Sequence, residues 1–63
     1  MNDMNGNRLR VGQMVLWFDP DVEARDLSRV YTIYEIREDF LLIGDEYSEE
    51  EVLPSEVLIV SKD

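Results

Sequence analysis

Carboxylates are the most abundant reactive groups in this chain, which has 15 acidic and 6 basic residues and a formal net charge of −9. Asp19, Asp21 and Glu23 alternate along one short stretch, an arrangement that resembles the start of a calcium-binding loop. Such a loop also needs a glycine at its sixth position and a glutamate at its twelfth, where this chain has Ala24 and Val30. The stretch is therefore interpreted as a solvated acidic turn, and no metal site is predicted.

Other side chains that perform catalysis are scarce. The chain has no Cys and no His, so it lacks the usual nucleophile–base pairs and the side chains that most often bind zinc. Its three glycines are isolated and form no phosphate-binding loop. Carboxylates in polar loops also lack the burial that raises the pKa of a general acid. The composition therefore predicts a protein that is not an enzyme and that uses no cofactor.

Aromatic side chains give a stronger indication of function. The chain has one Trp, three Tyr and two Phe, more rings than the interior of so small a chain holds. Neighbouring residues of a strand, such as Trp17 and Phe18, face opposite sides of the sheet, so some rings are expected on the surface. Exposed aromatic rings often mark a binding site for a partner. The predicted partner-binding residues are Trp17, Phe18, Asp19, Asp21, Glu23, Tyr31, Tyr34 and Phe40.

Short strands must position these residues. The chain consists of short apolar runs separated by acidic or turn-forming residues, a pattern typical of small all-β domains. Gly12 predicts a bend before the first strand, and Arg37–Asp39 predicts the turn of a hairpin. Strands are expected within residues 10–18, 29–37, 40–43, 51–53 and 58–60. The predicted core consists of Val15, Trp17, Val30, Ile33, Leu42, Val52 and Val57.

Two segments also have a helical alternative. Apolar residues between Leu27 and Tyr34 have the spacing of a helical stripe. A strand is nevertheless favoured there, because β-branched and tyrosine side chains lose more freedom in a helix than in a sheet. The residues from Ser48 to Glu51 match a capping box, but Pro54 limits any helix that starts there to about one turn.

Two motifs resemble those of SH3-like small barrels, a group that includes Tudor-like and KOW-like modules. Val11–Asp19 is similar to their opening strand, V-G-x-x-V-x-x-x-D. Val52–Val57 is similar to the ending I-P-S-N-Y-V, in which one 3₁₀ turn joins the last two strands. The resemblance covers residues 8–61 and implies an all-β domain: a five-stranded SH3-like partly open barrel with a 3₁₀ turn before the last strand. Residues 1–7 are then expected to form a flexible leader, and residues 62–63 a tail.

The chain departs from the SH3 domains that bind proline-rich peptides. Its first loop, Asp19–Ser28, is short, its third strand has no tryptophan, and Val57 stands where those domains have a groove-lining tyrosine. The resemblance therefore does not imply recognition of a polyproline helix. In overall character the chain is most similar to short, uncharacterised bacterial proteins with SH3-like folds.

The charge distribution decides which partners are expected. Residues 38–63 contain nine acidic residues and one basic residue, and such a surface repels nucleic-acid backbones, so direct nucleic-acid binding is not expected. The apolar runs are too short to cross a membrane, and the first residues do not match a signal peptide, so a cytoplasmic protein is expected. The leading hypothesis is a small protein-binding module or accessory protein. Its aromatic patch and acidic loops would engage a basic or amphipathic segment of a protein partner.

Two other functions remain open. Met14–Phe18 is apolar on both faces of its predicted strand, which suggests a structural or assembly subunit that acts as a homodimer. A cluster of carboxylates in the second half suggests instead an acidic mimic of nucleic acid. The residues of that cluster are Asp45, Glu46, Glu49, Glu50 and Glu51.

Overall fold

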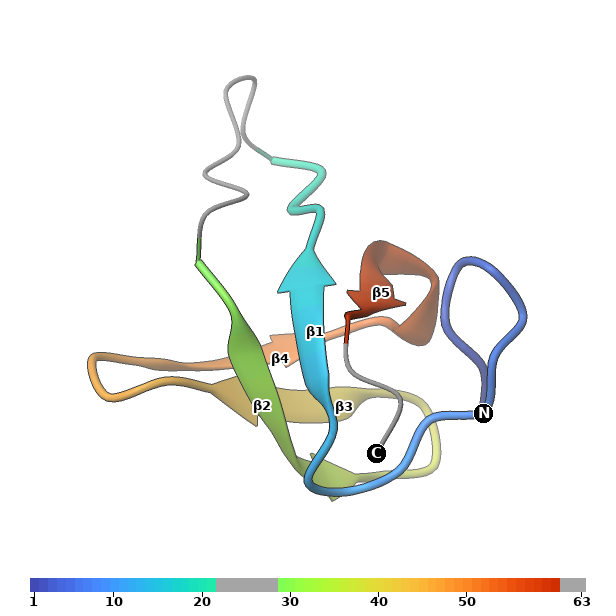
Figure 1. Cartoon of the computed structure of the whole chain (residues 1–63), viewed down its shortest axis with the longest axis horizontal. Coiled ribbons are helices and arrows are strands. Elements are labelled where there is room, and N and C mark those ends of the chain that lie inside the picture. The colour runs from blue at the N-terminus through green and yellow to red at the C-terminus, as the bar shows by residue number, and fades with distance from the viewer. Residues whose placement is uncertain (22–28, 61–63) are drawn as a thin grey trace.

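Five antiparallel strands form a single sheet, which confirms the all-β prediction. The computed structural model describes residues 1–21 and 29–60. The strand order is β4-β3-β2-β1-β5, so β4 and β5 are the edges and the sheet does not close between them. The elements are β1 (Met14–Trp17), β2 (Tyr31–Ile36), β3 (Leu41–Gly44), β4 (Glu49–Val52), the 3₁₀ helix η1 (Pro54–Glu56) and β5 (Val57–Ile59) (Figure 1).

The sheet twists strongly around its core. In Figure 1 the β3–β4 hairpin crosses behind β1 and β2, as expected when the twist of successive strands accumulates. The inner faces of all five strands thereby face one small apolar interior, with Trp17, Ile36 and Ile59 packed at its margin. The buried apolar residues are Leu9, Val15, Tyr31, Ile33, Leu41, Ile43, Val52 and Val57.

The strands form where β-branched residues and turn signals predict them. Tyr31–Ile36 is a strand, so the helical alternative for this segment is wrong. The predicted hairpin turn is closed by the Arg37 N–H, which donates to the Phe40 carbonyl at 2.9 Å. The capping-box helix is also wrong, because Glu49–Val52 pairs with β3 along its whole length. This strand begins two residues before the predicted start at Glu51. The single 3₁₀ turn at Pro54–Glu56 is present as predicted.

Gly12 turns the chain into β1. Its φ of 96° lies in the left-handed region that favours glycine. This conformation lets the Gly12 N–H donate to the Ile33 carbonyl at 2.9 Å, and the Ile33 N–H donate to the Gln13 carbonyl at 2.9 Å. The buried Gln13 side chain holds the same bend, because its Oε1 accepts the Arg10 N–H at 2.7 Å. The predicted bend thus aligns β1 with the middle of β2.

The predicted core is confirmed at Val15, Ile33, Val52 and Val57, and it needs correction at two positions. Val30 is 36% exposed, and its neighbour Tyr31 is buried instead. Leu42 is only half-buried, whereas Leu41 and Ile43 are fully buried. In the run Phe40–Ile43 every residue is apolar, so the alternation that distinguishes the two faces of a strand is invisible in the sequence.

A bulge in β2 keeps a charged residue out of this core. The pairing with β3 shifts register between Ile33 and Glu35. With an unbroken alternation, Glu35 would face inward together with Ile33. The extra residue instead places Ile36 against the core and leaves Glu35 in an ion pair with Arg37 at 3.0 Å.

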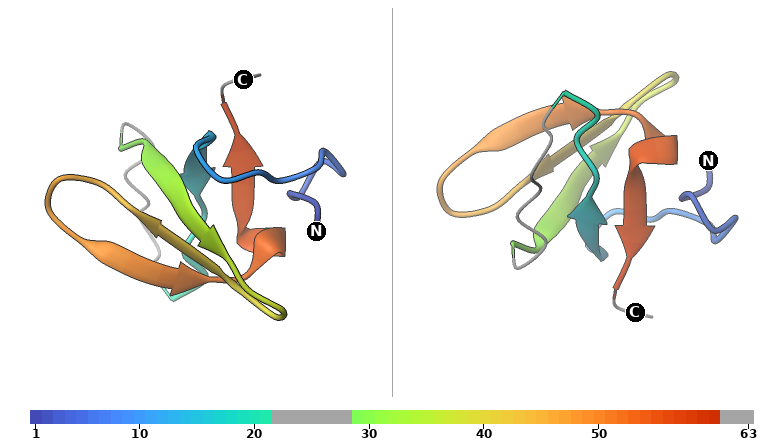
Figure 2. Two further views of the ribbon diagram at one scale, coloured as in Figure 1. Left: turned by 90° about the horizontal axis from the view of Figure 1, so that it is seen from below. Right: turned by 90° about the horizontal axis from the view of Figure 1, so that it is seen from above.

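The N-terminal residues lie along the outer edge of β5, whereas the sequence predicts a flexible leader. Asp3 is only 5% exposed. Its Oδ1 accepts the N–H groups of Asn5 and Asn7 at 2.9 and 2.8 Å, and its Oδ2 accepts the Ile59 N–H at 3.0 Å. Both views of Figure 2 show this segment beside β5. One carboxylate therefore folds the leader into a tight loop and ties it to the last strand. The predicted tail, residues 62–63, lies outside the described residues.

The pKa of Asp3 reflects this environment. Burial is the largest single influence and raises the pKa, because it penalises the charged form. The hydrogen bonds from Ile59, Asn7 and Asn5 act in the opposite direction and together outweigh burial. The pKa is consequently lower than the ordinary value of 3.8, and the carboxylate is charged at neutral pH.

Candidate partner-binding groove

A groove of about 330 Å³ lies where the ends of β1 and β4 meet η1. Three stretches far apart in the sequence form it: the end of β1 with the start of its following loop, Phe40 before β3, and the segment from β4 to η1. The lining residues are Trp17, Asp19, Pro20, Asp21, Phe40, Glu51, Val52, Leu53 and Glu56. The groove therefore joins the end of β1 to the end of the edge strand β4 and to η1.

The groove combines aromatic rings with carboxylates. Trp17 and Phe40 contribute rings, and the buried Val52 contributes an apolar floor. Asp19, Asp21, Glu51 and Glu56 contribute four carboxylates, and the lining residues within the described part of the chain include no Lys or Arg. Negative charges held beside low-dielectric walls focus a negative potential in such a hollow. The groove is therefore suited to a cation with an apolar stem.

The carboxylate of Glu56 is held in a fixed position at the wall of the groove. Its Oε1 accepts the indole Nε1–H of Trp17 at 3.3 Å and the backbone N–H of Leu53 at 3.3 Å. The second contact caps η1, whose first residue, Pro54, has no N–H of its own to satisfy. Trp17 and Glu56 thus form one positioned unit, an aromatic ring with an oriented carboxylate at its edge.

The opposite wall is the start of the loop after β1. The Asp19 Oδ1 accepts the Asp21 N–H at 2.9 Å, which forms an Asx turn around Pro20. Asp19 and Asp21 line the same groove as Glu51 and Glu56.

The structure brings together four of the predicted site residues: Trp17, Asp19, Asp21 and Phe40 all line the groove. Phe18 and Tyr34 do not line it. Tyr34 is 46% exposed and lies over Gly44, where an added Cβ would meet its Cε2 at 2.6 Å. Glu23 lies outside the described residues.

Tyr31 requires a correction, because it is expected on the surface but is only 7% exposed. Its ring packs edge-on against that of Trp17, with centroids 5.9 Å apart. The guanidinium of Arg29 lies over the ring, with its Cζ 5.1 Å from the centroid. Tyr31 therefore supports Trp17 from the interior and is not among the residues that line the groove.

Sequence reasoning missed Glu51, Leu53 and Glu56 as members of this site. Glu51 belongs to an acidic run that reads as solvated, and Glu56 reads only as part of the turn that launches the last strand. Neither residue has a local sequence feature that distinguishes it from a solvated acid, because both join the groove only through the folding of β4 and η1 against the end of β1.

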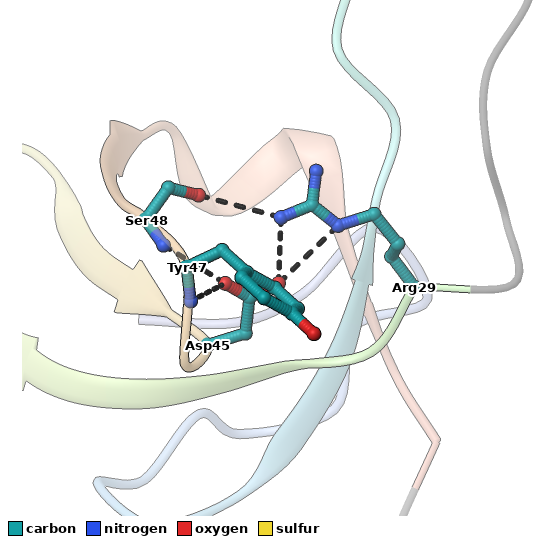
Figure 3. A network of polar contacts seen from close by, with 4 residues as sticks. All are labelled: Arg29, Asp45, Tyr47 and Ser48. Atoms are coloured by element: carbon teal, nitrogen blue, oxygen red, sulfur yellow. Dashed lines mark hydrogen bonds and ion pairs between the residues drawn. The ribbon is translucent and has the colours of Figure 1, made fainter.

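A second hollow, about 340 Å³ in volume, lies at the β3–β4 turn. One of its acidic lining residues, Asp45, holds the turn in place. The Asp45 Oδ2 accepts hydrogen bonds from Nη2 and Nε of Arg29 at 2.6 and 3.2 Å. Its Oδ1 accepts the N–H groups of Tyr47 and Ser48 at 2.9 and 3.0 Å (Figure 3). The Arg29 hydrogen bond, followed by that of Tyr47, lowers the pKa of Asp45. Asp45 is thus committed to fixing this turn to the start of β2.

Comparison with family models, curated proteins and solved structures finds no match to the chain. Within residues 1–21 and 29–60, no helix is long and apolar enough to cross a membrane. The same residues contain no group of three or more acidic side chains arranged to hold a metal ion. The groove is accordingly assessed on its own geometry and charge.

Proposed function

We propose that this protein is a non-enzymatic binding module that receives a Lys or Arg side chain of a protein partner in the groove between β1, β4 and η1. One observation carries the proposal: among the residues that the structure describes, the groove lining combines an aromatic ring, an oriented carboxylate and three further carboxylates, and includes no basic residue. A guanidinium stacks favourably on a tryptophan face and pairs with carboxylates at the ring edge. An ammonium on an apolar stem satisfies the same groove less specifically.

The charge of the whole chain supports the same partner. A net charge of −9 attracts a basic segment from a distance and accelerates its encounter, with an effect that weakens as salt increases. Aromatic contact area then contributes affinity that is less sensitive to salt. The proposal therefore requires binding that has both a salt-dependent and a salt-resistant component.

The finer architecture that we propose is an SH3-like, partly open barrel. Support comes from the order of the elements: a V-G-x-x-V first strand, a central β2–β3 hairpin and a single 3₁₀ turn between the last two strands. In this architecture the loop after β1 and the residues around η1 flank one groove, which is where the aromatic and acidic residues gather here. Recognition of a basic segment replaces recognition of a proline-rich one.

Fluorescence of Trp17, the only tryptophan of the chain, allows a direct test. A short capped peptide that alternates threonine and arginine is expected to change this fluorescence and to bind. The triple variant Asp21→Asn, Glu51→Gln, Glu56→Gln is expected to bind about tenfold more weakly, since each exposed charge pair contributes up to about 1 kcal/mol. Asp21→Asn alone should show part of this loss without disturbing the cap that Glu56 provides.

Glu46→Gln is the matched control, because it also removes one negative charge but lies in the exposed β3–β4 turn away from the groove. It is expected to reduce affinity only slightly, through the long-range field. Equal losses for Asp21→Asn and Glu46→Gln would mean that the peptide senses net charge alone, and the groove would then have no specific role.

A homodimer is the second candidate, and the outer face of β1 and β5 favours it. Met14 and Val60 are 45% and 46% exposed, and the half-buried Leu16 of β1 pairs with the half-buried Leu58 of β5 next to them. These side chains form an apolar stripe on the face of the sheet opposite the core, which burial in a dimer would remove from water. Sedimentation equilibrium should show self-association that Met14→Glu abolishes; a monomer at all concentrations tested would exclude this candidate.

A further inference from the structure

The two edges of the sheet are treated differently. At β5, the outward Val57 carbonyl accepts the Met4 N–H at 3.0 Å, and the outward Ile59 N–H donates to Asp3. The N-terminal segment therefore occupies this edge. At β4, no backbone group of residues 1–21 or 29–60 pairs with the side of the strand that faces away from β3. One edge is thus covered, and the other is open within the described structure.

The register of the β3–β4 hairpin determines which groups the open edge presents. The Asp45 N–H bonds to the Ser48 carbonyl at 2.9 Å, which makes these two residues a hydrogen-bonded pair. Hydrogen-bonded and non-bonded pairs alternate along an antiparallel ladder, so Ile43–Glu50 and Leu41–Val52 are the next bonded pairs. The N–H and carbonyl groups of Glu49 and Glu51 consequently point away from the sheet.

We propose that the open edge of β4 binds an extended, cationic segment of a partner as an added strand. This inference rests on the proposed function of the groove and specifies the conformation of its ligand. The backbone of the partner would pair with the outward groups of Glu49 and Glu51, as in other cases of strand addition. The groove begins at Glu51, Val52 and Leu53, so a strand laid along β4 leads directly into it.

Charge identifies the occupant. β4 has the sequence Glu-Glu-Glu-Val, and both Glu49 and Glu51 are exposed. A second copy of β4 at this edge would set glutamates against glutamates, which is unfavourable for directly opposed side chains. Lys or Arg residues at alternate positions of an added strand would instead lie opposite these carboxylates. A cationic chain therefore fits the edge that an identical chain does not.

Amide hydrogen exchange tests the backbone pairing directly. The capped threonine–arginine peptide is added at saturation to the labelled protein, and exchange is followed residue by residue by NMR. Exchange at Glu49 and Glu51 is expected to slow about tenfold or more as their amides become hydrogen-bonded. Amides of Glu50 and Val52, already directed toward β3, are expected to change much less.

Two further comparisons test the backbone hydrogen bonds between the peptide and β4, one between two peptides and one between two variants of the protein. Methylation of alternate backbone nitrogens of the peptide, on its pairing side, preserves every side chain but removes the donors and should weaken binding about tenfold or more. Glu49→Pro removes the outward donor of Glu49, and Glu49→Gln removes the same charge but keeps the donor. Proline is tolerated at an edge where the N–H faces solvent, so Glu49→Pro should bind several-fold more weakly than Glu49→Gln.

The outcomes separate this inference from the proposed function. If the methylated peptide binds as tightly as the parent and Glu49 and Glu51 exchange unchanged, the ligand uses side chains only. The strand-addition inference is then overturned, while the groove remains. If neither peptide binds, both proposals fail. Slow exchange at Glu49 and Glu51 in complex with the parent peptide, but not with the methylated one, supports strand addition.

Discussion

Replacing Asp3 with asparagine is expected to lower the free energy of unfolding by about 2–3 kcal/mol, the cost of losing a charged hydrogen-bond acceptor for the partly buried Ile59 amide. Asparagine keeps one oxygen for the turn formed with Asn5 and Asn7 but directs an NH₂ group at the Ile59 N–H. The leader would then separate from β5. Because a domain of this size has a net stability of only about 3–5 kcal/mol, the loss should be visible as a large shift in the urea midpoint.

Glu38→Gln is the control for this experiment, since it removes the same charge from an exposed position in the β2–β3 turn. Its unfolding free energy should stay within about 0.5 kcal/mol of that of the wild type. Equal stabilities for Asp3→Asn and Glu38→Gln would show that the tie between leader and β5 contributes nothing.

The pH dependence of this difference has a defined sign. Folding lowers the pKa of Asp3 below 3.8, so the folded protein releases this proton more readily than the unfolded chain does. The resulting stabilisation is fully present above the unfolded-state pKa and disappears as the pH falls through the folded-state pKa. Wild type and Asp3→Asn should therefore differ most near neutral pH and converge in acid. Comparing the two proteins cancels the titration of the other carboxylates.

Leu41→Ala is expected to cost about 2–5 kcal/mol, because it leaves a cavity in the fully buried core. The adjacent Leu42→Ala makes the same chemical change at a half-buried position on the other side of β3. It should cost much less, since solvent and neighbouring side chains fill the space. Urea denaturation of the two variants measures which leucine faces the core.

The pair also tests the register of the central hairpin. A larger cost for Leu42→Ala would mean that β3 is turned by one residue, so that its inner and outer faces are exchanged. Ile43→Val, expected to cost about 0.5–1.5 kcal/mol, gives an independent check on the same face.

Strand positions were predictable because they depend on local chemistry. Turn residues such as Pro54 and the β-branched run in β2 specify where strands begin and end, whatever they pack against. Which residues of β3 point toward the core could not be predicted in the same way. Leu41 and Leu42 are chemically identical, and only the completed sheet distinguishes them. The bulge near Glu35 is likewise a response to tertiary packing, because it removes an acidic residue from a position that would otherwise face the core.

In the candidate groove, too, some residues could be predicted from the local sequence and others could not. The sequence identified Trp17, Asp19 and Phe40, because aromatic residues that stand next to acidic residues can be recognised without knowing the fold. Glu56 was not identified, because its importance depends on meeting the indole of Trp17 across a separation of 39 residues. Tyr31 was wrongly predicted to be exposed, because the local sequence does not show whether a tyrosine ring packs in the interior or lies on the surface.

The bond between Asp3 and Ile59 also has a consequence for the order of folding. It joins residues 56 positions apart, so closing this loop costs more chain entropy than forming either central hairpin. We expect the β2–β3 and β3–β4 hairpins to form first and the leader to attach last. Until then β5 is an unprotected edge on an otherwise assembled sheet. The interval before Asp3 attaches is therefore the period in which this chain is most exposed to pairing with another.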